Sequence, residues 1–146
     1  MKETTGNLWD YYNLEDYVVC ITTNGDVTIR GFAVMGKGSA LDAKVKVPGL
    51  EVDLGRHLTK NGNTPTYLDD YRILTFPTKK HWRDNSDPKL IRKSAMVLKV
   101  LADKNPGLNF VLPRPGCGCG NLKWEDVKKL LVDLPDNVTV ISYKGE

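Results

Sequence analysis

The amino-acid sequence predicts an α/β protein, a three-layer α/β/α sandwich built on a mixed sheet. Short β-branched or apolar runs alternate with amphipathic helical segments along the chain, a pattern that favours a sheet with helices on both faces. The loops after several of these runs are rich in Gly, Asn or Lys. Because the 146 residues contain no Pro/Gly/Ser stretch long enough to be a linker, we expect residues 1–146 to form a single domain.

The first half of the chain is expected to supply two strands and two helices. Turn formers mark the strand ends, since Asn24 and Gly25 follow the first strand and Pro77 follows the second. In chain order the expected elements are a strand over 17–23, a short helix over 41–44 opened by a glycine loop over 36–40, a helix over 50–60 and a strand over 71–76.

The second half is expected to supply two helices and two strands. Ser86, Asp87 and Pro88 form a favourable helix start, because a capping residue precedes a proline in the first turn. The expected elements are a helix from there to about 105, a strand over 108–112, a loop over 113–121, a helix over 124–131 and a strand over 138–142. In such sheets ligands bind beyond the carboxyl ends of the strands, so the loops that follow strands carry the functional signal.

Composition limits the classes of protein that fit. With 40% hydrophobic and 27% charged residues, the chain is neither disordered, collagen-like nor coiled coil. A formal net charge of +3 excludes nucleic-acid binding by bulk charge alone, but it allows a local anion site. No apolar run approaches the ~20 residues of a membrane span, and the first residues lack the apolar stretch of a signal peptide. Cys117 and Cys119 are too close to pair, so we expect reduced thiols, a cytoplasmic location and no membrane contact.

The first chemically informative segment is the loop from Gly36 to Ala40. Glycines let the backbone approach a ligand closely, and the start of the following helix offers free N–H groups to an anion. The alternative is a plain glycine turn, because the loop matches neither the P-loop nor the full dinucleotide-binding pattern.

The second segment is the loop from Pro113 to Asn121, in which glycines alternate with two cysteines. It could form a second backbone cradle for phosphate. The alternative is a metal site at Cys117 and Cys119, completed by Cys20, His57 or His81. Since the C-x-x-C spacing of zinc and redox sites is missing, we expect no metal and no cofactor.

The third segment runs from Phe76 to Arg83, where an apolar strand leads into a cluster of cations. Lys79 follows the strand closely enough to enter a cleft, where a partly desolvated lysine can act as a nucleophile or an acid–base group. The alternative is a solvated basic loop. We expect His57 and His81 to be surface or packing residues, and Trp82 and Trp124 to lie in the core or in a pocket wall; the sequence leaves the place of Trp9 open.

The three segments together, in this order, resemble the macrodomain family, whose α/β/α fold binds ADP-ribose, and the resemblance covers nearly the whole chain. It matches residues 5–8 to the adenine site, Asn24 to the residue beside the distal ribose, and residues 33–40 and 113–118 to the two phosphate loops. The residues that the resemblance assigns to the ligand are Asn7, Leu8, Ala33, Val34, Met35, Gly36, Lys37, Gly38, Ser39, Ala40, Thr78, Pro113, Arg114, Gly116, Cys117, Gly118, Cys119 and Gly120.

Within the family, residues 34–38 and 76–83 are similar to DarG-type antitoxin macrodomains and to terminal ADP-ribose glycohydrolases. This resemblance implies that Lys79 is catalytic, that Asn24 orients the ribose, and that a monomer removes ADP-ribose from DNA or protein. Alternatives on the same fold are a phosphatase for ADP-ribose 1″-phosphate and a reader of ADP-ribose without turnover.

The chain departs from the family pattern at three places. Ile21 replaces an asparagine after the first strand, and residues 26–32 form an extra stretch before the first glycine loop. Gly120 stands where protein-directed relatives carry a catalytic aspartate. DarG-type domains, which act on ADP-ribosylated thymine in DNA, also have glycine there, so the resemblance favours a nucleic-acid acceptor.

Overall fold

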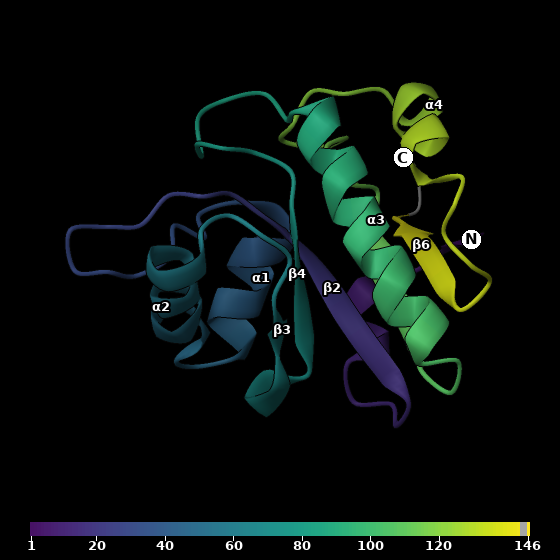
Figure 1. The fold of residues 1–146 in the computed structure, drawn as a ribbon, viewed down its shortest axis with the longest axis horizontal. Helices are drawn as coiled ribbons and strands as arrows, with labels where there is room; N and C mark the ends of the chain where they lie inside the picture. Colours follow the sequence, from purple (N-terminus) through teal and green to yellow (C-terminus); the bar gives the residue numbers. More distant parts are fainter. Residues whose placement is uncertain (144–145) are drawn as a thin grey trace.

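A six-stranded mixed sheet forms the centre of the molecule, in a computed structural model that describes residues 1–143 and 146 (Figure 1). The strand order is β1-β6-β5-β2-β4-β3, and only β3, at one edge, runs antiparallel to its neighbour. The strands are β1 (Lys2–Thr5), β2 (Tyr17–Thr23), β3 (Tyr67–Leu68), β4 (Ile73–Pro77), β5 (Asn109–Pro113) and β6 (Val138–Ser142).

Helices cover both faces of this sheet (Figure 1). Strand β2 faces both ways, since Val19 and Ile21 belong to one buried cluster while Val18 and Cys20 belong to the other. The helices are α1 (Gly38–Lys46) and α2 (Leu50–Asn61), which pack into the first cluster, and α3 (Pro88–Lys104) and α4 (Trp124–Val127), which pack into the second. The predicted α/β/α sandwich is therefore confirmed. Among the described residues, no helix combines the length and the apolar character needed to cross a membrane.

Several element boundaries differ from the sequence prediction. Helix α1 begins at Gly38 rather than at residue 41, because the second half of the glycine loop forms its first turn. Strand β4 begins at Ile73 rather than at residue 71, since Arg72 has a left-handed φ of 54° after a 3-10 turn over Asp69–Tyr71. The predicted start of α3 is confirmed, and Asp87 is its capping residue, because its carboxylate accepts a hydrogen bond from the Lys89 N–H.

Strands β1 and β3 were not predicted. All four residues of β1 are exposed, so the strand has no apolar face that a pattern could reveal. Its parallel pairing with residues 139–142 of β6 supplies the stabilisation instead. The helix predicted over 124–131 is also modified, because α4 ends at Val127 and continues as a 3-10 helix over Lys128–Leu131.

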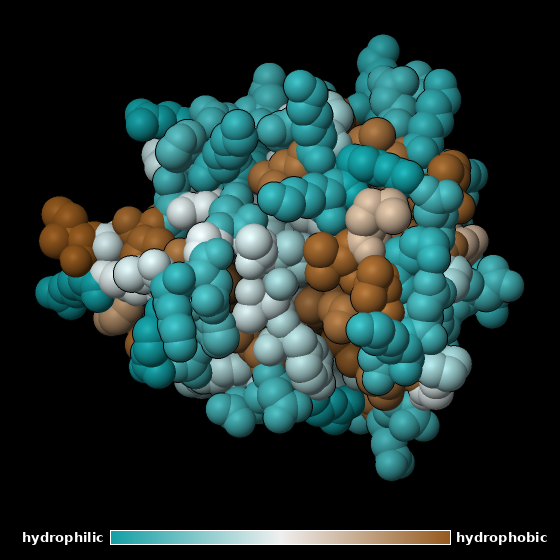
Figure 2. Space-filling model, in the orientation of Figure 1, coloured by the Kyte–Doolittle hydropathy of each residue, from teal (hydrophilic) through white to brown (hydrophobic). Residues whose placement is uncertain are grey.

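The extra stretch predicted from the sequence forms a finger, which we define as residues 26–33. It is closed by an antiparallel bridge between Val27 and Ala33 and by a 2.8 Å hydrogen bond from the Thr28 N–H to the Phe32 carbonyl. The loop between β2 and α1 projects beyond α2 in Figure 1, and the corresponding tip in Figure 2 is hydrophobic. Ile29 in this finger is fully exposed.

Candidate functional site

A cavity of about 350 Å³ lies where β2, β4 and β5 end, within the size range of small-molecule sites. It is the crevice expected beyond the carboxyl ends of parallel strands. Its walls are Thr22, Thr23, Asn24, Val34, Gly36, Lys37, Gly38, Ser39, Ala40, Asp42, Thr78, Lys79, Trp82, Ser86, Pro113, Arg114, Gly116, Gly118, Cys119, Gly120, Tyr143 and Glu146. All three segments singled out in the sequence therefore meet at one cleft.

The first glycine loop presents the start of α1 to this cavity. No side-chain hydrogen bond caps the helix at Lys37, so the N–H groups of its first turn keep their donor capacity. The Ser39 hydroxyl accepts a 3.0 Å hydrogen bond from the Thr22 N–H, which ties the helix to the end of β2. Gly38 has a left-handed φ of 59°, and a Cβ added there would meet no atom within 4 Å. The loop is open toward the cavity and is suited to an anion.

The second glycine loop packs tightly against the start of α3. A Cβ at Gly120 would lie 2.1 Å from the Ser86 hydroxyl and 2.5 Å from the Gly116 carbonyl oxygen. Gly116 itself has a φ of 78°, and a Cβ there would come within 2.9 Å of Ile91 Cδ1. The Ser86 N–H also donates to the Gly120 carbonyl at 3.0 Å. Glycine is required at both positions because the neighbouring chain leaves no room for a side chain.

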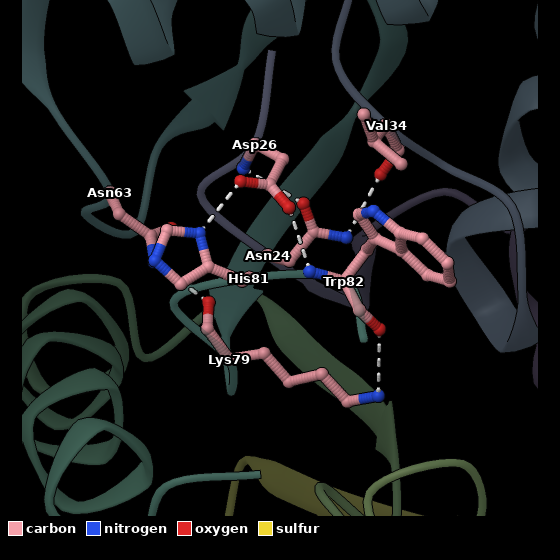
Figure 3. Close-up of polar contacts among 7 residues, drawn as sticks. All are labelled: Asn24, Asp26, Val34, Asn63, Lys79, His81 and Trp82. Atoms are coloured by element: carbon pink, nitrogen blue, oxygen red, sulfur yellow. Dashed lines mark hydrogen bonds and ion pairs between the residues drawn. The ribbon is translucent and has the colours of Figure 1, made fainter. Parts of the chain in front are cut away.

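Lys79 lies between these two loops. The N–H groups of Thr78 and Lys79 both donate to the Thr23 carbonyl, at 3.0 and 3.4 Å, so the end of β2 fixes the backbone. The Lys79 ammonium donates to the Cys119 carbonyl at 3.1 Å. It also donates to the Trp82 carbonyl at 3.4 Å (Figure 3). The side chain is half-buried and lines the cavity, whereas Lys80 is exposed. The amine thus lines the cavity beside the second glycine loop, and the first glycine loop lines the same cavity.

Asp26 holds the segment that follows Lys79. Its carboxylate oxygens lie 2.9 Å from His81 Nδ1 and 2.8 Å from the Trp82 N–H, which donates to it (Figure 3). Burial acts to raise the pKa of this carboxyl, but the hydrogen bonds from His81 and Trp82 outweigh burial and lower the pKa overall. Asp26 is therefore ionised near neutral pH.

Asn24 occupies the turn between β2 and the finger. Its amide donates a 3.0 Å hydrogen bond to the Val34 carbonyl, and its side-chain oxygen accepts one of 2.9 Å from the Asp26 N–H (Figure 3). Asn24 lines the cavity, as the sequence predicts, and the same side chain also fixes the position of the first glycine loop.

The structure does not bring five of the predicted ligand residues to the cavity. Leu8, Ala33 and Met35 are buried in the hydrophobic cluster beneath it. The Asn7 side chain accepts a hydrogen bond from the Trp9 N–H and caps a 3-10 helix over Leu8–Tyr11. The Cys117 thiol points back toward the Pro115 carbonyl and packs against the second cluster, where burial raises its pKa to about 11.

The cavity also has walls that the sequence analysis did not single out as site residues. Ser86 was interpreted only as part of a helix start, yet it lines the cavity with 5% exposure and its hydroxyl has no partner among the described residues. Tyr143 follows the last strand, and the rule that ligands bind beyond strand ends could have found it. Burial raises the pKa of the Tyr143 phenol, and the nearby Asp42 and Glu146 carboxylates raise it further.

The far side of the second loop is supported from β1. The Arg114 guanidinium, which lines the cavity, stacks 5.0 Å from the centre of the Trp124 ring. The Trp124 indole N–H donates to Glu3 at 3.0 Å, and Lys128 pairs with the same carboxylate at 2.6 Å. Trp124 is thus half-buried behind the cavity and not in its wall, while Trp9 is half-buried beneath Lys46.

The predicted histidines lie outside the cavity. His57 lines a separate hollow beside Tyr67 and Asp69, and His81 is exposed apart from its bond to Asp26. Within residues 1–143 and 146, no cluster of three or more His, Cys, Asp or Glu residues could hold a metal ion. The donors that face the cavity are therefore backbone N–H groups, hydroxyls and cations, which suit an anionic ligand.

Fold and cleft together define an α/β/α domain that offers backbone N–H groups to a ligand between two glycine loops. No family model matches the sequence. A DNA ADP-ribosyl glycohydrolase from Mycobacterium tuberculosis is 33% identical over 130 residues, covering 78% of this chain and 36% of that protein. An ADP-ribose glycohydrolase from Bos taurus is 30% identical over 101 residues, covering 68% of this chain and 66% of that protein.

The structural comparison covers almost the complete chain. The macrodomain of Mycobacterium tuberculosis DarG superposes with a TM-score of 0.75 at 28% identity, over 99% of this chain and 97% of that one. The chain belongs to the macrodomain family and is similar to its DarG-type members. It spans about a third of the length of the mycobacterial glycohydrolase, 36%.

Proposed function

We propose that this chain is an ADP-ribosyl glycohydrolase that removes ADP-ribose from a modified base in nucleic acid. The observation that carries the proposal is the position of the Lys79 amine, which lines the same cavity as both glycine loops and donates to the Cys119 carbonyl of the second. The names of the mycobacterial and bovine relatives, both glycohydrolases of ADP-ribose, support the same activity.

The ligand would be held chiefly by backbone. ADP-ribose carries two phosphate charges, and the uncapped start of α1 together with the second glycine loop offers N–H groups to them. This mode of binding needs no large positive charge, in keeping with a net charge of +3. Asn24, which lines the same cavity, would orient the distal ribose.

Hydrolysis breaks the bond between the anomeric carbon and the acceptor atom and forms a bond from that carbon to a water oxygen. The acceptor leaves with one proton, and the water loses one. An ammonium has three N–H donors, and two carbonyl oxygens already accept from Lys79, so one donor is left for the departing atom. The proton lost by water then restores the ammonium.

A second role for the same amine is attack on the opened sugar. Ring opening would leave the anomeric carbon doubly bonded to the acceptor nitrogen; the neutral amine would add to this carbon, and the acceptor nitrogen would leave with one of the amine's protons. Water would then hydrolyse the resulting imine on Lys79, which returns the amine and frees ADP-ribose. Borohydride added during turnover separates the two roles. It would leave a reduced ADP-ribose adduct on Lys79 if the imine forms and no adduct if the lysine acts as a proton donor.

The crowding at Gly120 favours a nucleic-acid acceptor over a protein acceptor. Protein-directed relatives of this family carry an aspartate at the matching position, and here Ser86 and Gly116 fill the space that its side chain would need. Among the described residues, the carboxylates that line the cavity are those of Asp42 and Glu146, and neither belongs to this loop.

Three substrates offered side by side test the proposal. The wild-type protein is incubated with an ADP-ribosylated thymidine oligonucleotide, an ADP-ribosylated glutamate peptide and ADP-ribose 1″-phosphate, and released ADP-ribose or phosphate is measured. Release of ADP-ribose from the oligonucleotide supports the proposal. Release of phosphate alone makes the chain a phosphatase, and tight binding of ADP-ribose without any release makes it a reader.

We also propose that the protein works as a monomer in the cytoplasm. The thiols of Cys20, Cys117 and Cys119 are free, which suits a reducing compartment. Light scattering coupled to size exclusion would test the monomer, and a fluorescent fusion in intact cells would test the location.

A further inference from the structure

The Trp82 side chain lines the cavity, and among the described residues its ring has no aromatic or cation–π partner. Its residue is 49% exposed and lines the same cavity as Lys79. Among the residues that the structure describes, it belongs to neither hydrophobic cluster. An aromatic ring half open to solvent beside a ligand cavity is a surface for another planar group.

The backbone beneath this indole is held from three sides. Asp26 accepts the Trp82 N–H at 2.8 Å, and the Gly25 N–H donates to the Lys80 carbonyl at 3.0 Å. The Asn63 amide donates to the Lys79 carbonyl at 2.9 Å (Figure 3). The segment cannot swing away from the cavity without breaking these bonds, so the ring is presented from a fixed backbone.

The finger that supplies Asp26 is itself braced against α2. The Ala33 N–H donates to the Glu51 carbonyl at 2.9 Å. Gly55 of α2 lies so close to the Gly31 carbonyl that an added Cβ would be 2.0 Å from its oxygen. A continuous set of contacts therefore runs from α2 through the finger to Asp26 and Trp82.

We propose that Trp82 is the stacking platform for the base that carries ADP-ribose, and that Asp26 is the residue that positions it. The inference rests on the proposed function, because it concerns the acceptor of the same reaction. Stacking of a base on an aromatic side chain tolerates any base, because every base has a π-face. Arg83, exposed directly after Trp82, adds a cation for the phosphates of the strand.

If Trp82 is the stacking platform, its removal should reduce kcat/KM on the modified oligonucleotide and leave the affinity for free ADP-ribose unchanged. Trp82→Ala should lower kcat/KM on the ADP-ribosylated thymidine oligonucleotide by at least ~10-fold, as expected for one lost stacking contact. Trp82→Phe should keep most of the activity, and both variants should bind free ADP-ribose within about 2-fold of wild type. Tyr67→Ala, which removes an exposed aromatic away from this cavity, is the matched control and should change neither quantity. Equal kcat/KM for wild type and Trp82→Ala would overturn the platform.

The positioning role of Asp26 is tested by measuring whether its substitution changes KM or kcat. Asp26→Ala should raise KM for the oligonucleotide several-fold and leave kcat largely intact, because the Lys79 backbone still donates to the Thr23 carbonyl and still accepts from the Asn63 amide. Asp26→Asn retains one acceptor and should recover part of the KM effect, while Asp103→Ala, an acidic residue on the surface of α3, should have none. A fall in kcat with KM unchanged would assign Asp26 to the chemistry and overturn its positioning role.

Failure of the inference can be told from failure of the proposed function. If wild type releases ADP-ribose from the oligonucleotide but Trp82→Ala is unaffected, only the platform is wrong. If wild type releases ADP-ribose from no substrate, the proposed function is wrong, and binding of an unmodified thymidine oligonucleotide decides the platform. Weaker binding by Trp82→Ala, measured by fluorescence anisotropy, would then support it, and equal binding would overturn it. An equal loss on the peptide substrate would also overturn a platform specific for bases.

Discussion

The two glycine loops that face each other across the cavity contain glycine for opposite physical reasons. In the first loop, a Cβ at Gly36 or Gly38 would meet no atom within 4 Å, so the space in front of these residues is free for a ligand. In the second loop, the spaces at Gly116 and Gly120 are already filled by Ile91, Ser86 and the loop's own backbone. The first loop is open at both of these glycines, whereas the second loop is packed into the protein at Gly116 and Gly120 and open at Gly118.

This difference separates two ways of losing function. A side chain in the first loop competes with the ligand for space and charge, so it should reduce affinity while the fold survives. A side chain at the crowded positions of the second loop competes with the packing of α3, so it should reduce stability. Similar runs of glycine in a sequence therefore do not carry the same kind of information.

The largest expected effect is the loss of stability in Gly120→Ala. Its Cβ would lie 2.5 Å from the Gly116 carbonyl oxygen, a backbone atom that cannot rotate away, in addition to the Ser86 contact. Overpacking of this kind should cost about 3 kcal/mol, measured by urea unfolding. Gly118→Ala, in the same loop but with no atom within 4 Å of its Cβ, is the control and should cost less than about 1 kcal/mol. Similar losses for the two variants would break the comparison.

The next effect is the loss of ADP-ribose affinity in Gly38→Glu. A carboxylate at the uncapped start of α1 would stand where a phosphate is expected, so affinity measured by calorimetry should fall by more than ~100-fold. Gly38→Ala is the matched variant, because it bears the same left-handed φ of 59° without the charge. It should cost about 1 kcal/mol of stability and retain binding within several-fold. If Gly38→Ala abolishes binding as well, the backbone conformation of the loop, and not its openness, determines affinity.

Lys79→Ala should lower the rate of ADP-ribose release by at least ~100-fold, the usual scale for a positioned acid–base group. The affinity for ADP-ribose should change little, because the backbone of the two loops holds the phosphates. Lys80→Ala, the exposed neighbour, should keep most of the activity. Equal and small effects of the two lysine variants would return the chain to the class of ADP-ribose readers.

Local sequence patterns predicted the elements and the three loops because each signal lies within a few residues. The β-branched run of β2, the proline at the start of α3 and the glycines of both loops can be recognised without knowing what they contact. The family resemblance added the expectation that these three loops surround one ligand.

Contacts between distant residues could not be predicted in this way. The crowding at Gly120 comes from Ser86, and the support of Trp82 comes from Asp26, 56 residues earlier in the chain. Strand β1 was missed for a related reason, since its exposed side chains carry no pattern and its pairing partner is β6. Leu8 and Met35 were assigned to the ligand from motif position alone, whereas packing places both beneath the cavity.

The smallest expected effect tests the support of the second loop from β1. Glu3 pairs with Lys128 and accepts a hydrogen bond from the Trp124 indole N–H, and the Arg114 guanidinium stacks on that indole. The hydrogen bond from Lys128, followed by that from Trp124, lowers the pKa of Glu3 below its ordinary value of 4.5 even though burial opposes it. A pKa that is lower in the folded than in the unfolded state stabilises the fold at pH values above the unfolded-state pKa. This contribution is lost as the pH falls through the folded-state pKa.

Glu3→Gln should therefore destabilise the protein by less than about 1 kcal/mol at about pH 7, as for other partly exposed pairs, and the difference from wild type should shrink at about pH 3. Urea unfolding at both pH values measures it. A loss that stays the same at the lower pH would mean that the shape of the Glu3 side chain, and not its charge, supports Trp124 and the second loop.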